Sequence, residues 1–243
     1  MIQLAYFQTN PQMGEKNKNL ESVKNAVLNY SGQFDIMVLP ELFHTGYGFS
    51  SQKELNQLAE TPDGEAYQLL KELAKKRNSY FFAGFAEKQK EGIYNSSMLV
   101  APDGKQWIYR KTHLFSEEKN FFIKSNSVLE PIEISIKEQK IKVGLMICFD
   151  WFFPETARTL SLKGAQILLH ATNLVMPHCP AATITRALEN RVFIVLCDRV
   201  GKDTLKDGRE IPFTGLSRIV SPKGEILSSS NETDEEIKVA SIN

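Results

Sequence analysis

The chain has 243 residues, and 42% of them are hydrophobic, which is enough for a substantial buried core. Lys and Arg number 29, and Asp and Glu also number 29, so the formal net charge is zero and nothing favours a nucleic acid, an anionic membrane or a polyanionic substrate as partner. The N-terminus has no basic region followed by a long apolar core, and no apolar run approaches the ~20 residues of a membrane span, so the sequence predicts neither a signal peptide nor a transmembrane helix.

Strand and helix patterns alternate through the first half of the chain. Leu20, Val23 and Val27 recur at helical spacing, whereas the apolar run 35–40 is short enough for a buried strand. The predicted elements are, in order, a strand at 2–8, a helix at 19–30, a strand at 35–40, a helix at 65–78, a strand at 79–86 and a hairpin at 97–111.

The second half repeats this alternation. Its predicted elements are two strands within 134–148, a helix at 154–164, a strand at 165–173, a helix at 180–191, a strand at 192–200 and a hairpin at 217–229. The two hairpins turn at Pro-x-Gly sequences that begin at Pro102 and Pro222. They hint at two similar halves that each supply a sheet, although such turns are common in hairpins. With no linker visible, we expect one α/β domain over residues 1–243, with helices outside.

Cys148 stands out among the three cysteines because the apolar strand before it runs straight into Asp150 and Pro154. We expect the strand to end at Asp150, which places Cys148 at a strand-to-helix elbow, where a nucleophile is exposed and backbone N–H groups face a developing oxyanion. The alternative is a small buried hydrophobe. Cys179 lies in an expected turn and Cys197 in an apolar strand, and both are interpreted as small buried hydrophobic residues. Their wide spacing predicts no disulfide framework or zinc site and suits a reducing cytoplasm.

A cysteine thiol, with a pKa of ~8.5, needs a base or a nearby cation to react at neutral pH. Glu41 directly follows a predicted buried strand, where desolvation would raise its pKa towards that of a working base; a helix cap or a surface acid is the alternative. Lys111 follows the second hairpin strand and stands among aromatic residues. It is interpreted either as a fixed positive charge that stabilises an oxyanion or as a snorkelling side chain whose stem covers apolar surface. A papain-like pairing of the cysteine with His113 or His170 is a further alternative.

Three segments carry a resemblance to a known family. PELF around Glu41, YRKTHLF around Lys111 and MICFDWFFPE around Cys148 resemble, in order and spacing, the signature segments of the nitrilase superfamily, the carbon–nitrogen hydrolases. The resemblance covers essentially the whole chain. It implies an α/β fold of the four-layer αββα sandwich type and a Glu–Lys–Cys triad at these three positions. It also implies a second catalytic glutamate, which by spacing is Glu118 rather than Glu117.

The resemblance implies a hydrolase that cleaves the carbon–nitrogen bond of a small amide, as an amidase or a carbamoyl-amine amidohydrolase. The reaction would pass through a cysteine thioester and release ammonia or an amine, with no metal or organic cofactor. Two alternatives stay open: a nitrilase that acts on small aliphatic nitriles, and a non-catalytic scaffold member of the family. The segment FDWFFPE at 149–155 is similar to both amide- and nitrile-processing branches and does not separate them.

Segments that flank the triad predict the substrate pocket. We expect Tyr47, Trp151 and Asn173 to shape it, and the backbone N–H of Phe149 to hold the oxyanion. The histidines beside Glu41 and Lys111 are expected in supporting or core positions. The family also implies a homodimer that packs helices of the second half across a twofold axis. Members usually continue into a C-terminal tail that reaches a neighbouring subunit, whereas this chain ends at KVASIN, so the expected dimer lacks that contact.

Overall fold

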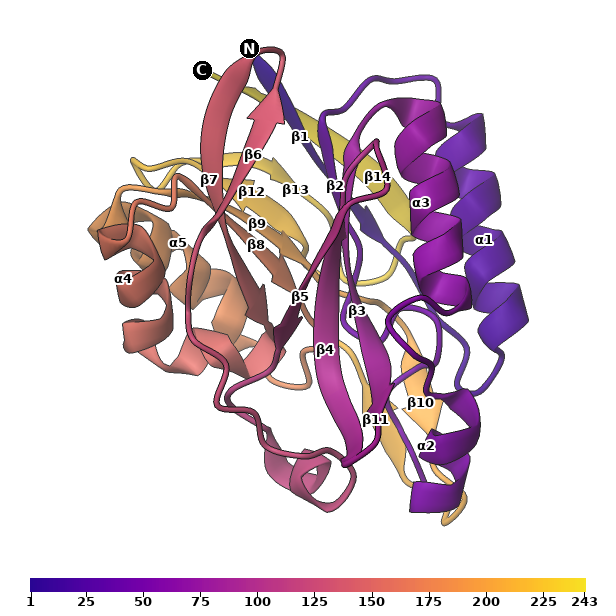
Figure 1. Ribbon diagram of the computed structural model, residues 1–243. Helices are drawn as coiled ribbons and strands as arrows, with labels where there is room; N and C mark the ends of the chain where they lie inside the picture. Colours follow the sequence, from indigo (N-terminus) through magenta and orange to yellow (C-terminus); the bar gives the residue numbers. More distant parts are fainter.

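The computed structural model describes all residues 1–243, which form two six-stranded sheets packed face to face (Figure 1). The first sheet has the order β14–β1–β2–β3–β4–β5, and the second has the order β13–β12–β9–β8–β7–β6. The first-sheet strands are β1 Ile2–Gln8, β2 Ile36–Val38, β3 Tyr80–Gln89, β4 Gly92–Val100, β5 Gln106–Arg110 and β14 Glu236–Ile242. The second-sheet strands are β6 Ile132–Ile136, β7 Gln139–Ile147, β8 Ile167–Ala171, β9 Phe193–Cys197, β12 Arg218–Val220 and β13 Ile226–Ser229.

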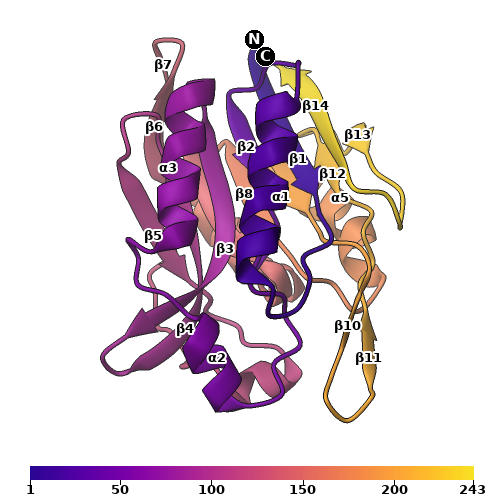
Figure 2. The same cartoon turned by 90° about the vertical axis from the view of Figure 1, so that its right-hand side faces the viewer.

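Two helices cover the outer face of each sheet (Figures 1 and 2). Helices α1 Lys16–Asn29 and α3 Glu65–Arg77 pack on the first sheet, and α4 Pro154–Leu162 and α5 His178–Asn190 pack on the second. The sequence pattern explains this placement, because the apolar positions of each helix recur on one face and are buried. None of the α-helices is long and apolar enough to span a membrane.

The largest hydrophobic core lies between the two sheets. Strand β7 shows how it forms: Val143, Leu145 and Ile147 point into this core, whereas Met146 belongs to a second core beneath α4 and α5. This alternation follows from the period of two in a strand whose two faces are both covered. A third core lies between the first sheet and its own helices. The layers are therefore helix, sheet, sheet, helix, which confirms the predicted αββα sandwich.

The two sheets have the same internal plan. Each has three parallel strands, β1–β2–β3 or β7–β8–β9, with an antiparallel strand at one edge and an antiparallel hairpin at the other. The hairpins that turn at Pro102 and Pro222 occupy equivalent edges, one in each sheet. The two similar halves that these turns indicate are thus present in the topology.

Some segments differ from the sequence-based expectation. Strand β7 ends at Ile147, not at Asp150, because the Asp150 carboxylate accepts the Ile147 N–H at 2.9 Å and turns residues 148–152 into a 3₁₀ helix. Cys179 lies in the first turn of α5 and not in a loop. The short helix α2 Gln52–Leu58 was not predicted.

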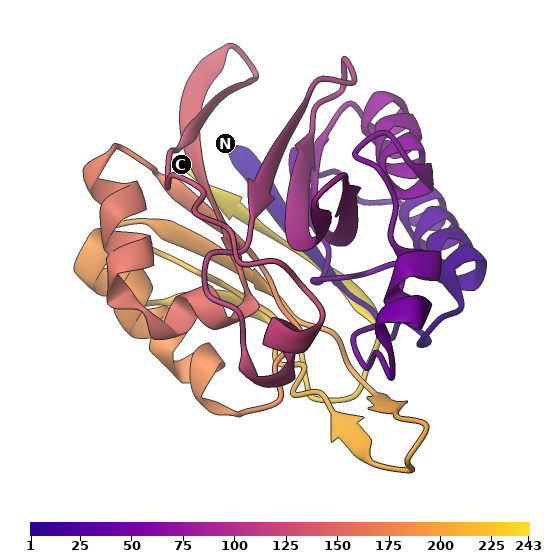
Figure 3. The ribbon, with the colours of Figure 1, turned by 60° about the horizontal axis from the view of Figure 1, so that its bottom comes forward.

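One small hairpin was also not predicted. Strands β10 Lys202–Thr204 and β11 Glu210–Pro212 pair only with each other and project from the body of the molecule (Figures 2 and 3). Each strand is three residues long and mostly polar, so neither produces a hydrophobic pattern.

Candidate active site

Side chains from three strand ends meet in the buried space between the two sheets. Glu41 lies three residues after β2, Lys111 directly after β5, and Cys148 directly after β7. The Lys111 Nζ atom is 2.7 Å from Glu41 Oε1, and both side chains are fully buried. The thiol of Cys148 comes from the opposite sheet; burial has the largest effect on its pKa, and Glu41 and Lys111 lie close enough to shift that pKa as well. The structure thus brings together the three residues that the sequence singled out.

The backbone at Cys148 is unusual. Its φ angle of +36° lies in the left-handed region, which costs free energy for a residue with a side chain and is frequent at functional turns. The His170 Nε2 atom lies 2.9 Å from the Cys148 carbonyl oxygen. Since a carbonyl can only accept, Nε2 carries the hydrogen, and burial lowers the pKa of His170 to about 4, which keeps the ring neutral. His170 therefore anchors the turn and does not face the sulfur.

Asp150 joins the Cys148 turn to the segment that carries Lys111. Besides the N–H of Ile147, its carboxylate accepts the Tyr109 hydroxyl at 2.8 Å and lies 2.8 Å from His113 Nδ1. Tyr109 and His113 stand two residues before and after Lys111. The opposite sheet is thereby fixed against the cysteine turn through one buried carboxylate.

The position of the Glu41 backbone depends on a glycine in the neighbouring strand. A Cβ atom at Gly84 would lie 2.5 Å from the Glu41 Cα, so only glycine lets the two backbones approach this closely. The carboxylate accepts Asn95 Nδ2 on Oε1 at 2.7 Å, the same oxygen that faces Lys111. The other oxygen, Oε2, is buried and has no hydrogen-bond partner. Glu41 therefore keeps one oxygen free to take a proton.

A second carboxylate shares the ammonium group. Lys111 Nζ donates to Glu118 Oε1 at 2.8 Å, and Tyr47 donates its hydroxyl to the same oxygen at 2.8 Å. Glu118 is buried within the 3₁₀ helix Ser116–Asn120. Its neighbour Glu117 is exposed and lies 3.4 Å from Arg209. Of the two candidates for the second glutamate, only Glu118 lies in the buried cluster.

Burial and the neighbouring charges together determine the protonation states in this cluster. Burial raises the pKa of Glu41 to about 7, against the opposing effect of Lys111. Burial also works to lower the pKa of Lys111, but Glu118 and Glu41 outweigh it and hold that pKa well above its usual value. The pKa of Cys148 is raised well above its usual value, first by burial and then by Glu41. The resting thiol is therefore protonated and needs a base to react.

A small cavity of about 10 Å³ lies beside Cys148, with mainly apolar walls. Of the predicted pocket residues it includes Phe149, Trp151 and Asn173; the other lining residues are Phe115, Leu174, Val175 and Met176. The Cys148 Sγ atom is 3.7 Å from the Asn173 carbonyl oxygen. Both polar atoms of the Asn173 side-chain amide are buried and have no partner in the protein. This amide is therefore available to a bound molecule.

Tyr47 does not line that cavity. It borders a neighbouring space of about 40 Å³ behind Glu118 and reaches the cluster through its hydroxyl. The sulfur forms its one hydrogen bond with Asn173, so neither His113 nor His170 makes a papain-like pair with it. His44 is fully buried and packs beside Phe43.

The sequence did not predict the supporting contacts of Asn95, Asp150 and His170, which hold Glu41 and the Cys148 turn in place. Asp150 had a usable signal, since it stands two residues after the cysteine. No group of three or more His, Cys, Asp or Glu side chains is placed to hold a metal ion.

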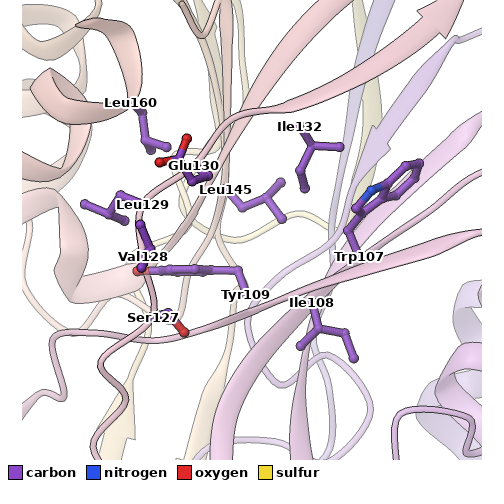
Figure 4. A pocket seen from close by; sticks show the side chains of 10 residues that line it. All are labelled: Trp107, Ile108, Tyr109, Ser127, Val128, Leu129, Glu130, Ile132, Leu145 and Leu160. Atoms are coloured by element: carbon purple, nitrogen blue, oxygen red, sulfur yellow. The ribbon is translucent and has the colours of Figure 1, made fainter. Parts of the chain in front are cut away.

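A separate and larger cavity of about 360 Å³ opens between β5, β7 and α4 (Figure 4). Its walls are mostly apolar and include Trp107, Leu145 and Leu160. Cys148 does not line it, but the ring of Tyr109 forms part of its wall while the Tyr109 hydroxyl reaches Asp150. This cavity is therefore a neighbour of the cysteine turn and not the reaction chamber.

Comparison with known proteins gives the same picture over the whole chain. The family model described as carbon-nitrogen hydrolase matches residues 3–243. A nitrilase of Pyrococcus abyssi is 45% identical over 244 residues, which cover 100% of this chain and 90% of that protein. An (R)-stereoselective amidase of a Pseudomonas species is 34% identical over 217 residues, or 88% of this chain and 75% of that protein.

Solved structures share the fold. A carbon-nitrogen hydrolase from Helicobacter pylori G27 superposes with a TM-score of 0.87 at 27% identity, over 98% of this chain and 88% of that chain. An amidase from Nesterenkonia sp. superposes with a TM-score of 0.82 at 23% identity, over 98% of this chain and 89% of that chain, a likeness that concerns the fold alone.

Proposed function

Because the chain belongs to the carbon–nitrogen hydrolase family, we propose that it hydrolyses a small amide through a thioester on Cys148. The observation that carries this proposal is the Glu41 carboxylate, which is buried beside Lys111 and keeps one oxygen free. A carboxylate with a pKa of about 7 is suited to general-base catalysis near neutral pH. The protonated thiol of Cys148 is the group that needs such a base.

In the first half-reaction, Glu41 takes the proton of Cys148 while the sulfur attacks the carbonyl carbon of the amide. The carbonyl electron pair moves to oxygen, and this oxyanion is held by the Lys111 ammonium and the Phe149 backbone N–H. One such donor typically contributes roughly 3 kcal/mol to transition-state stabilisation. The electron pair then returns, the carbon–nitrogen bond breaks, and ammonia or an amine leaves with the proton from Glu41.

In the second half-reaction, water hydrolyses the thioester. Glu41 removes a proton from water, the oxygen attacks the thioester carbon, and the carbon–sulfur bond breaks. The sulfur regains a proton as the carboxylic acid leaves. Lys111 donates to Glu118 at 2.8 Å as well as to Glu41 at 2.7 Å, and we propose that Glu118 keeps the ammonium in place.

We propose a small substrate with an apolar body, because the cavity at Cys148 is small and mainly lined by apolar side chains. Phe149 and Trp151 would contact that body, and the unpaired amide of Asn173 would bind the polar end of the substrate. The relatives named amidase, 2-oxoglutaramate amidase and N-carbamoylputrescine amidase agree with an amide substrate.

A nitrilase is the second candidate, since the Pyrococcus abyssi relative at 45% identity bears that name. A scaffold role is less consistent with a buried cluster in which every triad position is filled. Ammonia release from a panel of small amides, carbamoyl amines and aliphatic nitriles separates these functions, with Cys148→Ala as the control. Release from nitriles alone would assign a nitrilase, and release from none of them would leave the scaffold role.

We also propose that the chain is a single domain that acts as a homodimer in the cytoplasm. Leu162 and Leu188 are 78% and 49% exposed on the outer helices of the second sheet, where a partner could cover them. All three cysteines are unpaired, which suits a reducing compartment. Light scattering of the wild type and of Leu162→Glu tests the dimer; a monomeric wild type would refute it.

A further inference from the structure

A buried ion pair lies at the base of the β10–β11 hairpin, outside the cluster described above. Arg199 Nη1 is 3.0 Å from the Asp203 carboxylate, and the two side chains are 0% and 1% exposed. The guanidinium also donates to the Pro11 carbonyl at 2.6 Å and packs over the ring of Phe213, 4.0 Å from its centroid. A charge pair this deeply buried is expensive to desolvate, so stability alone is a weak reason for it.

The Asp203 carboxylate also holds the loop that carries Tyr47. Its Oδ2 atom accepts the backbone N–H groups of Tyr47 at 2.8 Å and of Gly48 at 2.9 Å. A Cβ atom at Gly48 would lie 3.0 Å from the Asp203 Cβ and 3.1 Å from Leu205, so the loop is pressed against the hairpin. Two charge-assisted hydrogen bonds therefore fix the backbone at the point where the Tyr47 side chain begins.

From this anchored backbone, the Tyr47 side chain reaches the catalytic cluster. Its hydroxyl lies 2.8 Å from the Glu118 oxygen that also accepts Lys111, and its ring stands edge-on to Phe213. Burial raises the pKa of Tyr47 well above its usual value, so the hydroxyl stays protonated and donates. Phe213 thus contacts the guanidinium of Arg199 on one side and Tyr47 on the other.

We propose that Asp203, whose charge is balanced by Arg199, is a positioning residue for Tyr47. It places the Tyr47 hydroxyl on Glu118, and Glu118 in turn holds the ammonium of Lys111 in position. This inference rests on the proposed function of the cluster. The chain of contacts starts at the Asp203 carboxylate, passes through the backbone N–H groups of Tyr47 and Gly48, and ends where the Tyr47 hydroxyl donates to Glu118. Asp203 touches neither the sulfur nor the cavity beside it, so it acts only through Tyr47.

A double-mutant cycle tests this role. Tyr47→Phe and Asp203→Asn should each lower kcat about tenfold to a hundredfold, the range for one hydrogen bond to a charged group. The double variant Tyr47→Phe/Asp203→Asn should lose no more than Tyr47→Phe alone, because the hydroxyl that Asp203 positions is already gone. Losses that multiply, or an unchanged Tyr47→Phe enzyme, would overturn the proposal. Glu210→Gln is the matched control, since it removes an exposed ion pair on the same hairpin and should leave kcat unchanged.

Asp203→Asn leaves Arg199 without its counter-charge and could prevent folding, so a second variant is needed. Gly48→Ala retains both charges but pushes the Tyr47 loop away from the hairpin by its added Cβ. It should lower kcat in the wild type and have little further effect in Tyr47→Phe. An equal loss in both backgrounds would contradict the positioning role.

A measurement without substrate separates this inference from the proposed function. Alkylation of Cys148 by iodoacetamide, followed against pH, reports the cluster even if no amide or nitrile is turned over. Asp203→Asn should move the midpoint of this profile to the same pH as Tyr47→Phe does, and the double variant should move it no further. A wild type that hydrolyses none of the panel refutes the proposed function alone. A profile that Asp203→Asn leaves unchanged refutes the positioning role alone.

Discussion

Replacing Glu41 by Gln should separate catalysis from stability. The cluster of Glu41, Lys111 and Glu118 contains two carboxylates and one ammonium, all buried. Glu41→Gln removes the base, which should lower the rate of acylation by about 10²- to 10⁴-fold. It leaves Lys111 paired with Glu118, so no buried charge loses its partner. We therefore expect an inactive protein that is at least as stable as the wild type at neutral pH.

The magnitude follows from the pKa of Glu41, which burial raises from 4.5 to about 7. Between these pH values the folded state holds a proton that the unfolded chain has released, so the stability of the wild type falls as pH rises through this window. At 1.36 kcal/mol per pKa unit, the loss is about 3 kcal/mol. Gln at this position does not titrate, so the variant should gain about that much relative to the wild type.

Urea unfolding at several pH values measures the stability, and single-turnover acylation measures the chemistry. The control is Glu65→Gln, which removes an exposed carboxylate and should change neither quantity. A Glu41→Gln protein that acylates at the wild-type rate would remove Glu41 as the base. A stability difference that stays constant from about pH 4.5 to about pH 7 would show that burial of this carboxylate is not costly.

Three further outcomes are expected. Cys148→Ala should abolish turnover while circular dichroism shows an unchanged fold; residual turnover would assign the nucleophile elsewhere. Iodoacetamide should label Cys148 before Cys179 and Cys197, at a rate that rises as pH passes the Glu41 pKa of about 7, because the carboxylate form accepts the thiol proton; peptide mapping checks the site, and even labelling of all three would contradict it. Gly84→Ala should cost about 1–3 kcal/mol in urea unfolding, because its Cβ meets the Glu41 backbone; an unaffected stability would refute the close approach.

The sequence predicted the layered fold because alternating apolar runs and helical periodicity are local patterns. Glu41, Lys111 and Cys148 were singled out because each follows a predicted strand, and the resemblance of their three segments to the carbon–nitrogen hydrolases joined them into one site. Strand ends are informative in this fold because the chain must leave a buried sheet there, and the side chains of several strands then meet.

The supporting residues were not predictable in this way. Asn95 and His170 contact residues 54 and 22 positions away, and nothing in the local sequence records such a contact. The positive φ of Cys148 occurs in a turn whose carbonyl is held by His170, 22 positions away, so the local sequence does not reveal it. Asp203 lies in a hairpin too short and polar to give a hydrophobic pattern.

The division of the site between two sheets has a mechanical consequence. The Cys148 sulfur is attached to the end of a strand in one sheet, whereas the Glu41 carboxylate and the Lys111 ammonium are attached at strand ends of the other. A slip of one sheet along the other by a single residue is ~3.3 Å, about the length of the hydrogen bonds that the cluster needs. The packed side chains between the two sheets therefore set the distance from the sulfur to the carboxylate and the ammonium. A substitution in this packing can disable the enzyme without touching any reacting group.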